Sequence, residues 1–324
     1  MTAPSSQAPL AQVPIVTVTL NPAIDQTITV EALRPGTVHR AREVRHNAGG
    51  KGVNVASCLA DWGAPVVATG LLGANNTAPF GALFAAKGIT DRFALVAGET
   101  RINVKIADLA SGDTTDINLP GLTASAADLE RVRAILHGLA VPGSLVLLAG
   151  SLPEGLPAGC YADLTADLAG RGVRVVLDSS GDPLAAALAA PRLPYCIKPN
   201  RHELEAWAGR PLPTEDAILD AARGLRARGV GVVVVSLGAD GALFLAEEGA
   251  LRAGLPPVQT LSTVGAGDAM VAGLIAAFRD GVPLEGVARL SVAFAVAKLG
   301  CFGPNLPGAD AVRALASQVR VTKL

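Results

Sequence analysis

The segment Ser262 to Asp268 reads Ser-Thr-Val-Gly-Ala-Gly-Asp and leads into an almost entirely apolar stretch, Ala269 to Phe278. Small residues at a helix start let backbone N–H groups converge on an anion, and the helix dipole adds about half a positive charge there. We therefore expect an anion hole at Gly265 to Gly267. Asp268, held ionised by the same dipole, could accept the proton of an attacking hydroxyl. An ordinary helix cap would give the same local pattern.

A second glycine-rich loop, Asn47 to Ala56, also leads into a helical pattern. Close backbone approach at Gly50, the ammonium of Lys51 and the amide of Asn54 suit a polyol or a ligand that carries phosphate. A tight turn with a solvated lysine is the alternative. Neither loop has the glycine spacing of a Walker phosphate loop or of a dinucleotide-binding fold.

Three polar residues follow or begin predicted strands near this loop. Asp25 comes just after the first strand, where its carboxylate could accept sugar hydroxyls or simply form an Asx turn. Arg101 and Asn103 alternate on one face of another strand. A guanidinium on that face would suit a substrate that already carries phosphate, unless Arg101 is only solvated.

Two further motifs follow strands in the second half of the chain. Asn200 and Glu203 are three residues apart at a helix start, where they could hold the water shell of Mg²⁺ or form a capping box without any ligand. The turn Ser236 to Gly241 could let a nucleotide lie against its backbone, although it also reads as an ordinary hairpin.

The elements that must position these motifs alternate along the chain. Near-continuously apolar, β-branched runs predict strands covered on both faces, and helical spacing is found between them. This alternation predicts a three-layer, doubly wound, mostly parallel α/β sheet. The expected strands are Ile15–Leu20, Val66–Leu71, Leu145–Leu148, Val173–Leu177 and Val232–Val235, and the expected helices are Gly52–Trp62, Ala78–Lys87, Ser125–Leu139, Pro157–Leu168 and Ala217–Arg228.

Two stretches interrupt the alternation. Residues 26–45 and 101–119 have the polar and apolar alternation of hairpins, and we expect them to form a second, smaller sheet, the lid, over the ligand-binding end of the main sheet. One face of that sheet would be uncovered, so we expect a homodimer joined through the lids. The expected organisation is a loose tail at 1–14 and one α/β domain at 15–324 with the lid inserted.

Composition excludes several classes of protein. Half of the residues are hydrophobic and 17% are charged, which argues against disorder. The 27 basic and 28 acidic residues nearly cancel, and aromatics are 3%, so nucleic-acid binding is not expected. No apolar run reaches the length of a membrane span, and the first residues do not read as a secretory signal. The absence of that signal leads us to expect a cytoplasmic protein. Four widely spaced cysteines fit neither a disulfide framework nor a metal site, and we expect them to be buried as small apolar residues.

Taken together, the motifs resemble the ribokinase-like (pfkB) family of carbohydrate kinases over about residues 15–300. Each motif is weak alone, but their ordered combination is specific. Two departures are Ala269, where a serine is usual, and residues 300–305, where the family lines the adenine pocket. The branch of the family that phosphorylates fructose 1-phosphate shares Asn21-Pro22-Ala23-x-Asp25, the segments Thr100–Lys105 and Thr115–Asn118, and the segment Lys198–Arg210.

The resemblance implies ATP and Mg²⁺, with Asp268 as the catalytic base. Gly265, Ala266 and Gly267 would form the anion hole. The sugar phosphate would contact Asp25, Gly50, Lys51, Asn54, Arg101 and Asn103. The residues that would contact ATP and its metal are Lys198, Asn200, Glu203, Ser236, Gly238, Gly241 and Thr263. Of these, Glu203 and Asn200 would bind the metal through water.

The expected activity is ATP-dependent phosphorylation of fructose 1-phosphate to fructose 1,6-bisphosphate. Kinases of tagatose 6-phosphate or fructose 6-phosphate are the alternatives within the family. A sensor that binds nucleotide or sugar phosphate without turnover, and a nicotinamide oxidoreductase, are alternatives from other classes. The glycine spacing argues against the oxidoreductase.

Overall fold

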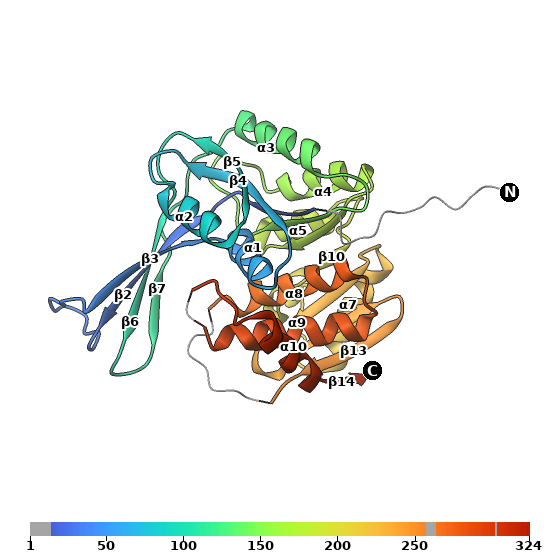
Figure 1. Ribbon diagram of the computed structural model, residues 1–324. Coiled ribbons are helices and arrows are strands. Elements are labelled where there is room, and N and C mark those ends of the chain that lie inside the picture. The colour runs from blue at the N-terminus through green and yellow to red at the C-terminus, as the bar shows by residue number, and fades with distance from the viewer. Residues whose placement is uncertain (1–13, 257–263, 302) are drawn as a thin grey trace.

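A large sheet runs through the body of the molecule in the computed structural model, which describes residues 14–256, 264–301 and 303–324 (Figure 1). Its strands are β1 (Ile15–Thr19), β4 (Val66–Gly73), β5 (Thr90–Val96), β8 (Leu145–Ala149), β9 (Arg174–Asp178), β10 (Cys196–Ile197), β11 (Val232–Ser236), β12 (Ala242–Ala246), β13 (Gly249–Gly254) and β14 (Arg320–Lys323). The order is β14-β13-β12-β11-β10-β9-β8-β1-β4-β5. Strands β11 to β5 in this order are parallel, and β12, β13 and β14 form an antiparallel edge. The expected mostly parallel sheet is confirmed.

Helices cover both faces of this sheet because its strands are apolar on both. In β8, Leu145, Leu147 and Ala149 pack into one core, and Val146 and Leu148 pack into the other. The first core is covered by α1 (Lys51–Asp61), α2 (Ala78–Lys87), α8 (Ala266–Asp280), α9 (Leu284–Leu299) and α10 (Ala309–Gln318). The second is covered by α3 (Ala126–Leu139), α4 (Cys160–Gly170), α5 (Gly181–Ala189), α6 (Arg201–Ala208) and α7 (Glu215–Ala227). The three layers follow from this division.

A smaller sheet projects from the body, and it is the expected lid (Figure 1). Its strands are β2 (Ala23–Val30), β3 (Glu43–Gly49), β6 (Ile102–Asp108) and β7 (Thr114–Ile117), in the order β3-β2-β6-β7. Thr27 pairs with Lys105, and Ile28 pairs with both Val44 and Ile106. Because successive side chains of a strand point to opposite faces, the lid has one polar face and one apolar face.

Two close contacts fix the helices that carry the glycine-rich loops. A Cβ atom on Gly52 would lie 2.4 Å from Oγ1 of Thr19, so α1 begins against the end of β1. A Cβ atom on Gly273 would lie 2.7 Å from Cα of Ser291, so α8 and α9 approach each other closely. Both contacts require glycine, because a side chain at either position would collide with its neighbour, and the contact of Gly52 places the start of α1 at the carboxyl end of β1.

Two expectations fall on residues outside the described ranges: the N-terminal tail, except for Pro14, and Thr263. Within the described ranges, no helix is long and apolar enough to cross a membrane.

Candidate active site

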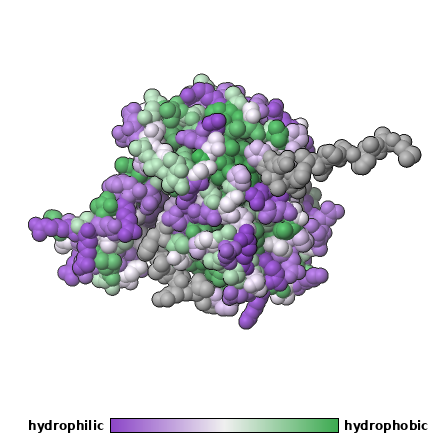
Figure 2. All heavy atoms as spheres, in the orientation of Figure 1, coloured by the Kyte–Doolittle hydropathy of each residue, from purple (hydrophilic) through white to green (hydrophobic). Residues whose placement is uncertain are grey.

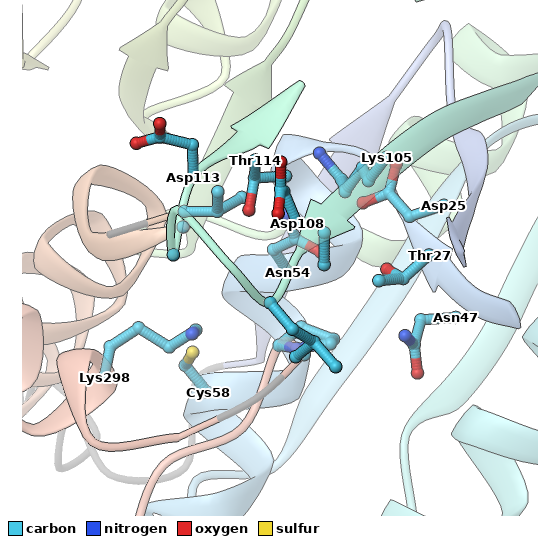
Figure 3. Close-up of a pocket in the computed structure, with 17 residues that line it drawn as sticks. Asp25, Thr27, Asn47, Asn54, Cys58, Lys105, Asp108, Asp113, Thr114 and Lys298 are labelled. Atoms are coloured by element: carbon cyan, nitrogen blue, oxygen red, sulfur yellow. The ribbon is translucent and has the colours of Figure 1, made fainter. Parts of the chain in front are cut away.

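A cavity of about 280 Å³ lies between the polar face of the lid and the main body (Figure 3). It is found at the end of the sheet where the sequence predicts a ligand, beside the starts of α1 and α8. Its lining includes Asp25, Thr27 and Lys105 of the lid, Asn54 and Cys58 of α1, Gly265 before α8, and Lys298 of α9.

The start of α8 has no side-chain cap on its first backbone N–H groups. Gly265 caps the helix in a left-handed conformation with φ of 82°, which glycine adopts without strain. It has no side chain to occupy the first-turn N–H groups, so the amides of Ala266 and Gly267 can meet an anion. Asp268 is the third residue of the helix, and the ordinary-cap interpretation of this residue does not hold.

Asp268 is buried, with 8% of its surface exposed. Its Oδ2 accepts a hydrogen bond of 2.8 Å from Nδ2 of Asn54, which lines the cavity. Burial and the negative charge of Asp178 raise the pKa of Asp268 to about 6, against the opposing effects of Lys51, Asn54 and Lys198. The helix dipole therefore does not set the protonation of Asp268 by itself. Above pH 6 the carboxylate is ionised and can serve as a base.

A buried carboxylate pairs with two lysines beside Asp268. Asp178, 1% exposed at the end of β9, lies 3.2 Å from Nζ of Lys51 and 3.5 Å from Nζ of Lys198. Burial would raise the pKa of Asp178, but the two ammonium groups outweigh it and hold that pKa below its usual value. Nζ of Lys198 is also 3.7 Å from the position of a Cβ on Gly267. Lys51 is paired, so the solvated-lysine interpretation of its loop is wrong.

The loop before α1 has the close approach expected of it. Gly50 caps α1 with φ of 108°, and a Cβ there would lie 2.9 Å from Cγ2 of Thr19. Its carbonyl accepts a hydrogen bond from the backbone N–H of Asn54. The loop thereby presents Lys51 and Asn54 at the helix start.

Asp25 lies on the polar face of the lid and in the cavity wall. Nδ2 of Asn103 donates to its Oδ1 at 3.3 Å. Burial raises the pKa of Asp25, partly offset by Lys105 and by the Asn103 hydrogen bond. The carboxylate is therefore near two groups that can share a sugar hydroxyl with it.

Arg101 lies at the base of the lid. Its guanidinium donates to the backbone carbonyls of Pro22, Leu119 and Asn21 at 3.3, 3.2 and 3.4 Å. Arg101 is half-buried and is not among the residues that line the cavity. Its contacts join the turn after β1 to the lid.

The residues expected on the nucleotide side form local structures near one another. Asn200 and Glu203 form a reciprocal capping box, in which Oδ1 of Asn200 accepts from the Glu203 amide at 2.9 Å and Oε2 of Glu203 accepts from the Asn200 amide at 2.8 Å. Asn200 also forms a β-bridge with Ser236. Gly238 and Gly241 flank a turn between antiparallel strands β11 and β12, so the hairpin interpretation is correct. These five residues do not line the cavity of Figure 3.

Four residues that the structure places in or beside the site have no predicted site role from the sequence. Asp178 follows a predicted strand, Val173–Leu177, and its position at the strand end was a usable signal. Lys105 and Asn47 lie within quoted motifs and line the cavity. Lys298 follows the apolar run at residues 292–297 of α9, and that contrast was its signal.

Comparison with known proteins gives consistent results. The family model described as pfkB family carbohydrate kinase matches residues 18–311. A 1-phosphofructokinase of Xanthomonas campestris is 53% identical to this chain, and the match covers 88% of this chain and 90% of the relative. A 1-phosphofructokinase of Rhodobacter capsulatus is 48% identical, and the match covers 96% of this chain and 98% of the relative. The structure of phosphofructokinase-2 from Escherichia coli in complex with substrates and products has a TM-score of 0.89 at 29% identity, covering 94% of this chain and 99% of that one.

The protonation of Asp268 gives a direct test of the site. Carbon-13 NMR of protein labelled at aspartate carboxyls, with the Asp268 signal assigned through Asp268→Asn, is expected to show a pKa near 6. In Lys51→Met the pKa is expected to rise further, because the variant removes a cation that favours the ionised form and frees the Asp178 charge to repel it. A pKa near 4, or a fall in Lys51→Met, would contradict this account of the charges.

Proposed function

This chain belongs to the pfkB family of carbohydrate kinases, and we propose that it transfers the γ-phosphoryl group of ATP to the 6-hydroxyl of fructose 1-phosphate. The products would be fructose 1,6-bisphosphate and ADP. Relatives named 1-phosphofructokinase match almost the full chain at 53% and 48% identity. The observation that carries the proposal is the buried Asp268 at the first turn of α8, beside a side-chain-free anion hole and bonded to a residue of the cavity wall.

The chemistry follows from this arrangement. Asp268 accepts the proton of the 6-hydroxyl while that oxygen attacks the γ-phosphorus in line. The new P–O bond forms as the bond between the γ-phosphorus and the β–γ bridging oxygen breaks, and ADP leaves with the electron pair. The amides at Gly265 to Gly267 and the ammonium of Lys198 bind the phosphoryl oxygens while their charge redistributes.

The sugar phosphate is proposed to lie between the lid and α1. Asp25 and Asn103 would accept and donate hydrogen bonds to sugar hydroxyls, while Gly50, Lys51 and Asn54 would approach from the loop before α1. We assign Arg101 to the phosphate already on the substrate. It would exchange one of its long bonds to a backbone carbonyl, 3.2 to 3.4 Å in length, for a stronger charge-assisted bond.

ATP is proposed to lie across the ends of β10 and β11. Lys198 would contact the phosphates, and Ser236, Gly238, Gly241 and Thr263 would line the nucleotide. The donor set fits a hydrated Mg²⁺ and not a directly ligated ion. Oε2 of Glu203 is already used in the capping box, and the negative charge of Glu203 contributes to raising the pKa of Lys51. The described residues contain no cluster of three or more acidic, histidine or cysteine ligands. When bound, Mg²⁺ would neutralise charge on the phosphates.

Assembly through the lid is proposed from its outer face. Val44 and Ile117 on the edge strands are 46% and 47% exposed, and Ile28 and Ile106 lie between them on the same face. Apolar residues are visible among polar ones on the projecting sheet (Figure 2). A second copy of the same face would cover these side chains in a symmetric dimer. The four free cysteines fit the cytoplasmic location that we propose.

The substrate is tested by measuring ADP release in a coupled assay with fructose 1-phosphate, fructose 6-phosphate, tagatose 6-phosphate and the free sugars. We expect kcat/KM to be highest for fructose 1-phosphate by at least about tenfold. The other sugar phosphates place the phosphate on a different carbon, and the free sugars lack it, so both would leave polar groups of a buried site unpaired. A higher value for another sugar phosphate would replace the substrate. No ADP release with any acceptor would refute a kinase.

Replacing Asp268 tests both its role in catalysis and the stability that the protein loses by burying its charge. Asp268→Asn is expected to retain ATP binding and lose at least about 10²-fold in kcat. The rise of the Asp268 pKa from 3.8 to about 6 also predicts a gain of up to about 3 kcal/mol in the free energy of unfolding at pH 8, vanishing below pH 4, because the ionised form is the one that burial penalises. The control is Asp182→Asn, at an exposed aspartate in the first turn of α5. Unchanged turnover in Asp268→Asn would remove the assignment.

The lid dimer is tested by sedimentation velocity. The unaltered protein is expected to sediment as a dimer and Ile117→Asp as a monomer, because the aspartate would bury a charge against an apolar face. Leu95→Asp changes a leucine of similar exposure, 50%, on β5 of the main body and is expected to remain dimeric. A monomeric unaltered protein, or a dimer that survives Ile117→Asp, would refute assembly through this face.

A further inference from the structure

Lys298 is a buried cation near the end of α9 that the proposed mechanism does not use. The residue is 2% exposed, and its Nζ donates to the backbone carbonyl of Cys301 at 2.9 Å. The other lysines near the first core and the site each pair with a carboxylate; they are Lys51, Lys87, Lys105 and Lys198. Among the described residues, no carboxylate lies within ion-pair distance of Lys298. A buried charge without a counter-ion is costly and calls for a partner.

The position of Lys298 indicates what that partner is. Its Cε is 3.4 Å from the position of a Cβ on Gly265, and both residues line the cavity. Lys198 approaches Gly267 from another element, with its Nζ 3.7 Å from the position of a Cβ there, so the first turn of α8 lies between two lysine side chains. An anion bound by the turn would be the counter-ion of both.

The groups around Lys298 leave donors of its ammonium for such an anion. Its ammonium and the sulfur of Cys58 lie close together at one wall of the cavity (Figure 3). Burial and the charges of Asp268 and Asp61 raise the pKa of the Cys58 thiol to about 12, so the thiol remains neutral. Burial lowers the pKa of Lys298, with Asp268 acting in the opposite direction. A lysine has three donors, and the Cys301 carbonyl occupies one.

We propose that Lys298 is a catalytic residue of phosphoryl transfer, which donates a hydrogen bond to an oxygen of the transferred group at the Gly265 end of the anion hole. The inference rests on the proposed kinase function and adds a second lysine to the machinery. Lys198 and Lys298 would then hold the phosphoryl group from both sides of the helix start, while its charge redistributes among its oxygens.

A purely structural role for Lys298 is the competing explanation. Its contact with Cys301 could serve only to hold the loop from 301 to 306. Lys87 offers a matched control, because its Nζ contacts the Pro304 carbonyl of the same loop at 3.4 Å and pairs with Asp61 at 2.7 Å, yet Lys87 does not line the cavity. A variant of Lys87 therefore weakens the loop without changing the charge at the anion hole.

The first experiment compares Lys298→Met and Lys87→Met with the unaltered protein, using its best sugar-phosphate acceptor. Lys298→Met is expected to lower kcat by about 10²-fold, with KM for ATP changing less than about threefold, since the lost bond acts on the transition state. Lys87→Met is expected to lower Tm and to leave kcat within about threefold. Equal losses of kcat in the two variants, or a kcat of Lys298→Met near that of the unaltered protein, would overturn the proposal.

The second experiment tests for the missing charge by chemical rescue. Lys298→Ala leaves a space that ammonium ion can enter, so ammonium chloride is expected to raise its kcat at least about tenfold. Tetramethylammonium chloride, which is larger and has no N–H donor, should not, and Lys298→Met, whose side chain fills the space, should not respond to either salt. Absence of ammonium rescue in a Lys298→Ala protein of native Tm would refute the proposal.

The two proposals fail differently. An unaltered protein that releases no ADP with any acceptor removes the kinase function, and with it the role of Lys298. An active protein whose Lys298 variants match it removes the role of Lys298 alone. Should both Lys298 variants lose the native Tm, the residue is structural and the proposal is wrong.

Discussion

The electrostatic balance around Asp268 is the constraint on which the rest of the site depends. A buried carboxylate becomes a useful base only if its pKa lies above that of an ordinary aspartate but below the working pH. Burial and Asp178 raise the pKa, while Lys51 and Lys198 limit the rise. Asp178 thus has two effects, since it repels the base and also holds the two lysines that moderate that repulsion.

This balance needs groups that are distant in the sequence, and the parallel sheet brings them together. Asp178 ends β9, Lys198 follows β10 directly, and both lie at the carboxyl edge where parallel strands leave the sheet. Two helices complete the cluster, because Lys51 lies at the start of α1 and Asp268 lies at the start of α8. The close contact of Gly52 with Thr19 makes the position of α1 possible, and that of Gly273 with Ser291 lets α8 pack closely against α9.

The sequence predicts the features of this protein that are local or periodic. Apolar runs predict the parallel sheet, alternation in Ile102–Asp108 predicts the lid, and small residues predict the helix start at Gly265. The pKa of Asp268 could not be predicted in this way, because it depends on Asp178 and on two lysines whose distances are set by tertiary packing. Lys298 is similar, since nothing in its own helix shows that its side chain would meet Gly265 from another element. For Arg101, strand alternation gives a face but not the backbone carbonyls that the guanidinium contacts.

The lid connects catalysis with assembly through a single periodicity. Successive side chains of a lid strand point to opposite faces of the sheet. The register that places Asp25, Thr27 and Lys105 at the cavity therefore places Ile28 and Ile106 on the opposite face. A phosphoryl-transfer site needs the lid over the cavity, because water there would compete with the sugar hydroxyl for the phosphoryl group. Any contact that covers the apolar face also stabilises the lid strands that carry the polar one. In the proposed dimer, oligomerisation and exclusion of water would therefore be coupled by the alternation of side chains along the four lid strands.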